Sequence, residues 1–383
     1  MQHRSKLPKS ETTIFSVMSA LANEHQAINL GQGFPDYDCN EDLKQLITKH
    51  LNEGKNQYCP MPGLLDLRQA ISHKLNRSYN IEIDASDEIT ITAGATQALF
   101  TAITAFIHAG DEVIIFEPAY DSYFPSILLA GGTPKPYRMY APDFKIDWTA
   151  VEDLITDKTK MIIINSPHNP TGTSLSEEDL LCLQEIVKEK DIVILSDEVY
   201  EHLIYDKQEH QSVLRFPQLF QKCIAVYSFG KTFHATGWKI GYAVGPKALM
   251  KEFRNVHQWN VFSVNSFIQY ALAEYLKIPD SYEYLSSFFQ SKRDLLLEEL
   301  KDLPLEATPA QGTYFQVFDY SQISSLSDFE FAKYLTKDIG VAAIPLSPFY
   351  SEEIKEKSIR LCFAKEDSTL LKAAENLRKL TKL

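Results

Sequence analysis

The sequence predicts an α/β protein in which helices cover both faces of a mostly parallel sheet, with a smaller α+β domain attached. Three observations lead to this fold class. Between residues 88 and 244, short apolar runs alternate with helical segments, as in parallel sheets. After about residue 280, strands flank helical stretches instead. The chain has 383 residues and 44% hydrophobic content, enough for a large core and two domains in one compact unit.

The N-terminal part is predicted to contain helices and turns. Apolar residues recur at helical spacing between Thr12 and His25. A turn-rich stretch follows at residues 31–36, and its glycines lack the spacing of a dinucleotide-binding fingerprint. We expect further helices at residues 42–53 and before Tyr79, separated by a loop at residues 56–63.

The middle of the chain supplies the strands of the sheet. Helical segments fall between most of them, for example at residues 96–108 and 176–190, and the charged stretch 177–191 is interpreted as the solvated face of one covering helix. The six strand candidates are Glu88 to Thr92, Glu112 to Phe116, Lys160 to Asn165, Asp191 to Ser196, Cys223 to Ser228 and Lys239 to Val244.

The C-terminal part is expected to form the smaller α+β domain. A helix is predicted at residues 291–303, and strands at residues 312–317, 341–345 and 358–363. The sequence contains neither an internal repeat nor a low-complexity tract.

Composition excludes several classes of function. The net charge of −13 argues against nucleic acid as a partner. Five scattered cysteines predict neither a disulfide framework nor a metal site, and fit a reducing cytoplasm. The segment Met1 to Pro8 lacks the apolar core of a signal peptide, and no later segment is long and apolar enough to span a membrane.

Polar loops follow five of the predicted strands. Because ligands bind at the carboxyl ends of strands in open parallel sheets, we expect these loops to converge on one crevice. The loops are residues 93–97, 117–120, 166–172 and 197–200 and the stretch that contains Lys231.

Lys231 is a candidate nucleophile in a loop rich in small residues. A deprotonated lysine forms an imine with a carbonyl, and burial or a neighbouring cation such as Lys239 lowers the pKa enough for this. The alternative is a surface loop with two solvated lysines. A phosphate-binding loop is excluded, because that motif requires glycine where Ala225 stands.

The other loops suit a cofactor with a phosphate, a basic aromatic ring and a carbonyl. The helix that opens at Gly94, Ala95 and Thr96 would hold the phosphate with its amides, helped by Ser228 and Lys239. Tyr120 would stack on the ring, although plain packing is the alternative.

Asp197 ends an apolar strand, where a carboxylate needs a cation such as a protonated ring nitrogen. A helix N-cap is its alternative role. Tyr200 and Asn169 can donate hydrogen bonds to a ring hydroxylate, or Asn169 can simply belong to a turn. Arg360 lies in an otherwise apolar strand, which suits capture of a substrate carboxylate or a structural ion pair.

These residues together resemble the class I aminotransferases, which depend on pyridoxal phosphate and have the aspartate-aminotransferase fold. Residues 29–36 are similar to the branch that contains kynurenine and glutamine transaminases, and within it the chain is most similar to bacterial methionine aminotransferases. The resemblance runs from about Lys6 to the C-terminus. Its motifs are residues 166–172, 197–200, 228–232 and 358–363.

The resemblance implies a seven-stranded sheet and two domains. The large cofactor-binding domain would span residues 45–285. The small domain would combine residues 1–44 with residues 286–383. A homodimer is also implied, in which Tyr58 reaches the cofactor phosphate across the interface.

The resemblance also assigns roles to the site residues. Lys231 would hold the cofactor as an aldimine and then move the proton between substrate and cofactor. Asp197 would pair with the ring nitrogen, and Arg360 would bind the substrate α-carboxylate. The remaining cofactor-binding residues would be Gly94, Ala95, Thr96, Tyr120, Asn169, Tyr200, Ser228, Lys239 and Tyr58, and Asn169, the Gly33 backbone and Phe15 would contact the substrate.

The implied reaction moves the amino group of an amino acid to a 2-oxo acid. Methionine is the expected donor, with aromatic amino acids and glutamine as other candidates. The alternative on the same fold is a carbon–sulfur β-lyase acting on cysteine conjugates or cystathionine. A ligand-sensing regulator would need an N-terminal DNA-binding domain, for which the motif at Asn29 is expected to leave no room. Ile14 and Phe15 differ from the aromatic pair of mammalian kynurenine transaminases, and His168 replaces a common asparagine.

Overall fold

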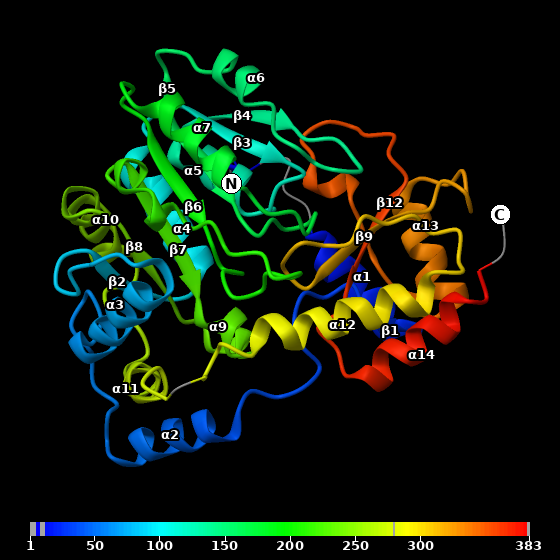
Figure 1. The fold of residues 1–383 in the computed structure, drawn as a ribbon, viewed down its shortest axis with the longest axis horizontal. Coiled ribbons are helices and arrows are strands. Elements are labelled where there is room, and N and C mark those ends of the chain that lie inside the picture. Colours follow the sequence, from blue (N-terminus) through cyan, green and yellow to red (C-terminus); the bar gives the residue numbers. More distant parts are fainter. Residues whose placement is uncertain (1–4, 8–11, 279, 381–383) are drawn as a thin grey trace, which may run out of the picture.

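The computed structural model describes residues 5–7, 12–278 and 280–380 (Figure 1). The segment from Met1 to Pro8, for which the sequence analysis expects no signal peptide, therefore lies mostly outside the described residues. None of the helices in the described ranges combines the length and the apolar character that a membrane crossing requires.

A seven-stranded sheet forms the centre of the larger lobe, in the order β2-β8-β7-β6-β5-β3-β4 (Figure 1). Only β8 is antiparallel to its neighbours β2 and β7, so the predicted mostly parallel sheet is confirmed. The strands are β2 (Ile89–Thr92), β3 (Glu112–Glu117), β4 (Thr133–Arg138), β5 (Thr159–Asn165), β6 (Val193–Asp197), β7 (Cys223–Ser228) and β8 (Gly241–Val244).

Strand β4 is the one strand of this sheet that was not predicted from the sequence. Its sequence, TPKPYR, contains Pro134 and Pro136, which weaken any strand prediction. The strand lies at the edge of the sheet and pairs only with β3. Proline is tolerated there because a missing amide hydrogen can face away from the ladder.

Helices cover both faces of this sheet, because alternate strand residues point to opposite sides. On one face, α4 (Ala95–Phe106), α5 (Tyr123–Ala130) and α10 (Lys247–Asn260) pack on side chains such as Val113 and Leu195. On the other face, α3 (Leu65–Tyr79) and α7 (Glu177–Val187) pack on Ile114 and Ile194. Helix α7 exposes its charged side, as predicted.

The C-terminal part forms a second, three-stranded antiparallel sheet in the order β11-β12-β9, on the right in Figure 1. Its strands are β9 (Phe315–Asp319), β11 (Ile344–Pro345) and β12 (Ser358–Cys362). The single strand predicted at residues 341–345 is interrupted at Ala343, because β10 (Val341–Ala342) pairs instead with β1 (Ile28–Asn29). This pairing joins the N-terminal segment to the C-terminal lobe.

The remaining helices complete the two lobes. Helix α12 begins at Leu285 rather than at Ser291, and it packs lengthwise on α14 (Figure 1). The division into residues 45–285 and residues 1–44 with 286–383 stays a prediction. The other helices are α1 (Ile14–Glu24), α2 (Glu41–Asn52), α6 (Trp148–Asp153), α8 (Pro217–Phe220), α9 (Phe229–Thr232), α11 (Ser266–Tyr275), α12 (Leu285–Leu300), α13 (Asp328–Tyr334) and α14 (Asp367–Leu377).

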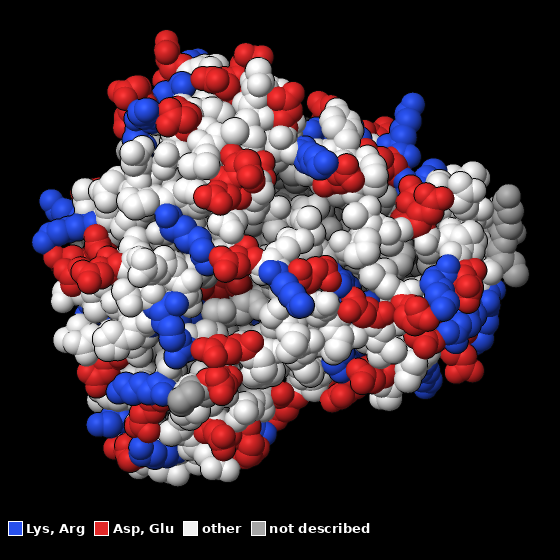
Figure 2. Space-filling model, in the orientation of Figure 1, with Lys and Arg blue, Asp and Glu red and all other residues white. Residues whose placement is uncertain are grey.

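Acidic and basic side chains are interspersed on the surface. Figure 2 shows lysines and arginines scattered among acidic residues, with no continuous basic stripe on the face in view. Together with the net charge of −13, this distribution offers no electrostatic footprint for a phosphate backbone on that face.

Candidate active site

One cavity lies at the carboxyl ends of the strands, as the loops predicted. Its volume is about 740 Å³, counting the open mouth, within the range of small-molecule sites. Loops that follow β2, β3, β5, β6 and β7 all contribute to its wall. Ten predicted residues line it together: Gly94, Ala95, Thr96, Tyr120, Asn169, Asp197, Tyr200, Ser228, Lys231 and Lys239.

Lys231 lies in the short helix α9, directly after β7, and its amine points into the cavity. Its Nζ donates hydrogen bonds to the Tyr314 hydroxyl at 2.8 Å and to the Gly33 carbonyl at 3.4 Å. Burial, with the charges of Arg360 and Lys239, lowers the pKa of Lys231 to about 8. A useful fraction of the amine is therefore unprotonated near neutral pH, as a nucleophile requires.

Asp197 ends β6 with a side chain that is 3% exposed. The Tyr123 hydroxyl donates to its Oδ2 at 2.6 Å, and the Val199 amide donates to Oδ1 at 3.4 Å. Burial raises the pKa of Asp197 to about 6. The carboxylate faces the cavity and has no ion-pair partner among the described residues, so a ligand cation would stabilise it.

The N-terminus of α4 and its surroundings form an anion cradle. Gly94 precedes the helix with φ of 79°, and no side chain caps the first turn. A Cβ at Gly94 would lie 3.5 Å from the Lys239 Nζ, which shows how closely this cation approaches the loop. Ser228 and Thr236 line the same wall. Free amides at a helix N-terminus, hydroxyls and a lysine suit a phosphate.

Arg360 lies in β12 and is 1% exposed. Its Nη1 donates to the Asn169 Oδ1 at 2.7 Å and its Nη2 to the Gly31 carbonyl at 3.2 Å. Neither partner is a carboxylate, and Nε has no partner in the described part of the chain. Burial lowers the pKa of Arg360 to about 10, so it stays cationic at neutral pH. The guanidinium can therefore bind a substrate carboxylate by donating hydrogen bonds to it.

Aromatic rings surround the Arg360 guanidinium. Its carbon lies 3.7 Å from the centroid of the Phe315 ring, 5.3 Å from that of Phe15 and 5.4 Å from that of Phe349. Gly33 lies against the same group, since a Cβ there would meet the Phe315 ring at 2.7 Å. Phe15 and Gly33 thus lie beside Arg360 rather than on the wall of the cavity that contains Lys231.

Tyr58 is not brought into this cavity. Its side chain is 80% exposed and packs edge-on against Phe262 at 5.3 Å between centroids. Its assignment to the partner's site in a dimer stays a prediction. His168 also lies outside this cavity: it lines a neighbouring one, and burial lowers the pKa of its ring to about 3.

Four residues at the site were not predicted from the sequence: Tyr123, Asn165, Thr236 and Tyr314. Asn165 binds the Asp197 carbonyl through Nδ2 at 2.8 Å and the Asn169 amide through Oδ1 at 2.8 Å. Its place at the end of a predicted strand was an available signal. Tyr123 and Tyr314 act through hydroxyls whose partners lie far away in sequence, so no local pattern marks them.

Comparisons with known proteins identify the family of the chain. The model of the family "Aminotransferase class I and II" matches residues 25–377. A methionine aminotransferase of Escherichia coli is 50% identical over 378 residues, which cover 98% of each chain. A kynurenine–oxoglutarate transaminase of Dictyostelium discoideum is 36% identical, over 98% of this chain and 97% of the relative.

Solved structures extend the likeness to the whole fold. YbdL from Escherichia coli, for which a methionine aminotransferase function was identified, superposes with a TM-score of 0.98 at 49% identity, covering 99% of this chain and 100% of that one. An aspartate aminotransferase of Thermus thermophilus superposes with a TM-score of 0.91 at 31% identity, with the same coverage. The chain therefore belongs to the class I and II aminotransferases and is an enzyme with the aspartate-aminotransferase fold.

Proposed function

We propose that this aminotransferase takes the amino group of methionine and transfers it to a 2-oxo acid, with pyridoxal phosphate as its cofactor. The observation that carries the proposal is the meeting of Lys231, Asp197 and the α4 anion cradle in one cavity, with Arg360 beside it. The 50% identity to a methionine aminotransferase supports the choice of donor.

The residues present fit this cofactor. The α4 amides with Thr96, Ser228 and Lys239 would hold its phosphate. Asp197 would face the ring nitrogen, and the positive charge of this nitrogen would offset the free-energy cost of burying the carboxylate. Tyr120 would lie against the ring, while Asn169 and Tyr200 would donate to its hydroxyl group. When bound, pyridoxal phosphate supplies an electron-withdrawing ring that acidifies the substrate Cα.

Side chains of the protein would then orient the substrate and transfer its proton. Arg360 orients the substrate through its α-carboxylate, with the Asn169 side chain fixed at 2.7 Å from the guanidinium. Lys231, with a pKa near 8, is suited to accept a proton from Cα and to return it at a second carbon. The buried tyrosines around the site exclude water from this transfer.

The surroundings of Arg360 favour an apolar substrate side chain. Phe15 and Phe349 face the guanidinium, and apart from Arg360 beside the cavity we find no arginine at its wall among the described residues that could bind an acidic side chain. A thioether makes favourable contacts with aromatic rings, which supports methionine. Aromatic amino acids and glutamine are the next donors to test.

Two further features belong to the proposal. We expect a homodimer, because Tyr58, which the resemblance assigns to a cofactor phosphate, is 80% exposed and lies outside the cavity of its own chain. In such a dimer Tyr58 would complete the phosphate site of the partner subunit.

All five cysteines are free thiols, which supports the reducing cytoplasm as the compartment.

A single half-reaction tests the function. The purified protein, loaded with cofactor, is mixed with L-methionine and no 2-oxo acid, and its absorption spectrum is followed. We expect the carbonyl form of the cofactor to convert to the amine form, while D-methionine leaves the spectrum unchanged. A carbonyl band that persists with L-methionine contradicts the donor. Turnover with release of ammonia favours a carbon–sulfur lyase instead.

A further inference from the structure

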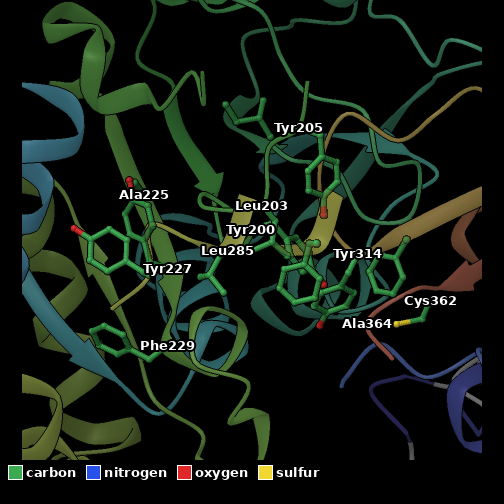
Figure 3. Close-up of a cluster of buried hydrophobic side chains, with 14 of the residues drawn as sticks. Tyr200, Leu203, Tyr205, Ala225, Tyr227, Phe229, Leu285, Tyr314, Cys362 and Ala364 are labelled. Atoms are coloured by element: carbon green, nitrogen blue, oxygen red, sulfur yellow. The ribbon is translucent and has the colours of Figure 1, made fainter. Parts of the chain in front are cut away.

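Tyr314 lies beside Lys231 and has no part in the steps above. It directly precedes β9, and its side chain is 0% exposed. Figure 3 shows its ring next to that of Tyr200, and the two pack edge-to-face at 5.1 Å between centroids. Phe315 and Phe289 pack on it from other sides at 4.8 and 5.9 Å. These contacts fix the ring, and therefore fix the position of its hydroxyl.

The hydrogen bonds of Tyr314 have a defined direction. Its hydroxyl lies 2.6 Å from the Gly33 carbonyl, which can only accept. The single hydroxyl proton is therefore used for Gly33, and the oxygen can only accept a hydrogen bond from the Lys231 Nζ at 2.8 Å. Burial raises the pKa of Tyr314 well above its ordinary value, so the hydroxyl keeps its proton at neutral pH. Tyr314 is thus a fixed acceptor rather than a base.

We propose that Tyr314 is a positioning residue, which holds the free amine of Lys231 while that amine carries a proton between substrate and cofactor. The inference rests on the proposed function. In the transfer, the Lys231 amine would take the proton from the substrate Cα and become an ammonium, while the electron pair of the broken C–H bond would pass to the electron-withdrawing ring that bound pyridoxal phosphate supplies. The Lys231 ammonium would then release this proton at a second carbon and become an amine again. Tyr314 accepts a hydrogen bond throughout and neither gains nor loses a proton.

The flexibility of the lysine side chain explains why a positioning residue is needed. The side chain has four carbons and many rotamers, so the free amine does not stay directed at the substrate unless a hydrogen bond restrains it. In this structure the restraint consists of two acceptors, the Tyr314 hydroxyl and the more distant Gly33 carbonyl. Tyr314 also fixes the Gly33 carbonyl, so both acceptors depend on one side chain.

The test is Tyr314→Phe in the loaded enzyme, with Tyr205→Phe as the matched control. Tyr205 is also fully buried and donates to a backbone carbonyl, that of Thr313, but it does not contact Lys231. Tyr314→Phe removes the hydrogen bond that the charged Lys231 Nζ donates. Because hydrogen bonds to charged groups are strong, we expect kcat to fall about 10-fold or more. The isotope effect with Cα-deuterated methionine should increase, because proton transfer becomes slower. Tyr205→Phe should change neither quantity.

A second measurement does not depend on turnover. The full chain, freed of cofactor, is mixed with pyridoxal phosphate, and the rate of imine formation is followed against pH. The rate rises with the unprotonated fraction of Lys231, with a midpoint near its pKa of about 8. Without the Tyr314 acceptor the ammonium is less stable, so Tyr314→Phe should move this midpoint to lower pH.

The outcomes separate the two proposals. A wild-type enzyme that does not transaminate methionine contradicts the proposed function, and the midpoint of imine formation still decides on Tyr314. An active wild type, together with an unchanged isotope effect and an unchanged midpoint in Tyr314→Phe, overturns the positioning role. If Tyr314 had only a structural role, Tyr314→Phe and Tyr205→Phe would both lower the melting temperature. Neither variant would then change the isotope effect or the pH midpoint of imine formation.

Discussion

Asp197 illustrates how a functional charge costs stability. Its pKa is raised from 3.8 to about 6, so the ionised carboxylate destabilises the cofactor-free fold above pH 6, and this loss fades as the pH falls towards 3.8. This change in the pKa of Asp197 corresponds to about 3 kcal/mol in the free energy of unfolding. We expect Asp197→Asn to raise the free energy of unfolding of the cofactor-free chain by up to that amount at pH 8, and by almost nothing at pH 4. Urea denaturation at both pH values measures this.

Asp206 provides the control of opposite sign. Hydrogen bonds from Arg293 lower the pKa of Asp206, so its ionised form stabilises the fold above the unfolded pKa. Asp206→Asn should therefore lower the free energy of unfolding at pH 8. In the loaded enzyme, Asp197→Asn should also lower kcat, because the cofactor ring loses its ionic partner. Equal stability of wild type and Asp197→Asn at pH 8 would show that burial costs this carboxylate nothing.

Arg360 carries the second prediction at this scale. A lysine at this position keeps the charge but loses the planar fork that reaches Asn169 and Gly31 together. We expect Arg360→Lys to lower kcat/KM about 10- to 100-fold for both the amino acid and the 2-oxo acid, since hydrogen bonds to charged groups contribute about 1.5–3 kcal/mol. Steady-state kinetics with each substrate varied measures this loss. Arg254→Lys, on α10, is the control and should leave both values unchanged.

The residues that the sequence identified share one property. Lys231, Asp197 and Arg360 are charged groups that adjoin or interrupt apolar runs, and a buried charge is conspicuous because it needs a partner. Tyr123 and Tyr314 have no such mark, since a tyrosine among apolar residues is ordinary core. Their function depends on the direction of one hydroxyl, which only the folded chain defines.

At the scale of elements, Gly94 connects β2 to the anion cradle of α4. Its φ of 79° suits glycine, and an added Cβ would lie 3.4 Å from the Lys239 side chain. We expect Gly94→Ala to lower stability by about 1–3 kcal/mol through backbone strain, and in addition to weaken cofactor binding. Equilibrium dialysis against pyridoxal phosphate measures the second effect.

Gly54 is the matched control for this strain. It has φ of 77°, and no atom lies within 4 Å of an added Cβ. Gly54→Ala should therefore lose a similar amount of stability but keep the affinity for the cofactor. Weakened cofactor binding in both variants would mean that strain alone, rather than the cradle, explains the effect.

Elements were predictable where their patterns were strong. Apolar runs such as Cys223 to Ser228 identified six strands of the large sheet, and helices with clear caps were found within a few residues. Strand β4 could not be found, because its prolines are compatible with a strand only at an edge, and edge position is a property of the assembled sheet. The pairing of β1 with β10 likewise joins segments far apart in sequence.

At the scale of the whole molecule, the proposed dimer makes a prediction that no single chain can satisfy. Tyr58 is 80% exposed and lies outside the cavity of its own chain, so it would serve the partner's cofactor. We expect Tyr58→Ala to weaken cofactor binding, and Lys231→Ala to be inactive. When the two variants are unfolded together and refolded, a mixed dimer has one site with an intact Lys231 and an intact Tyr58 from the partner.

Such a mixture should therefore show more activity, at limiting cofactor, than either variant refolded alone. The reason is geometric: the two substitutions fall in the same site of one protomer and leave the other site whole. The control is a mixture of Lys231→Ala with a chain carrying both substitutions, which should gain nothing. Sedimentation in parallel should give twice the mass of the 43.6 kDa chain. Sedimentation as a monomer, or a mixture no more active than its parts, would place Tyr58 outside the site.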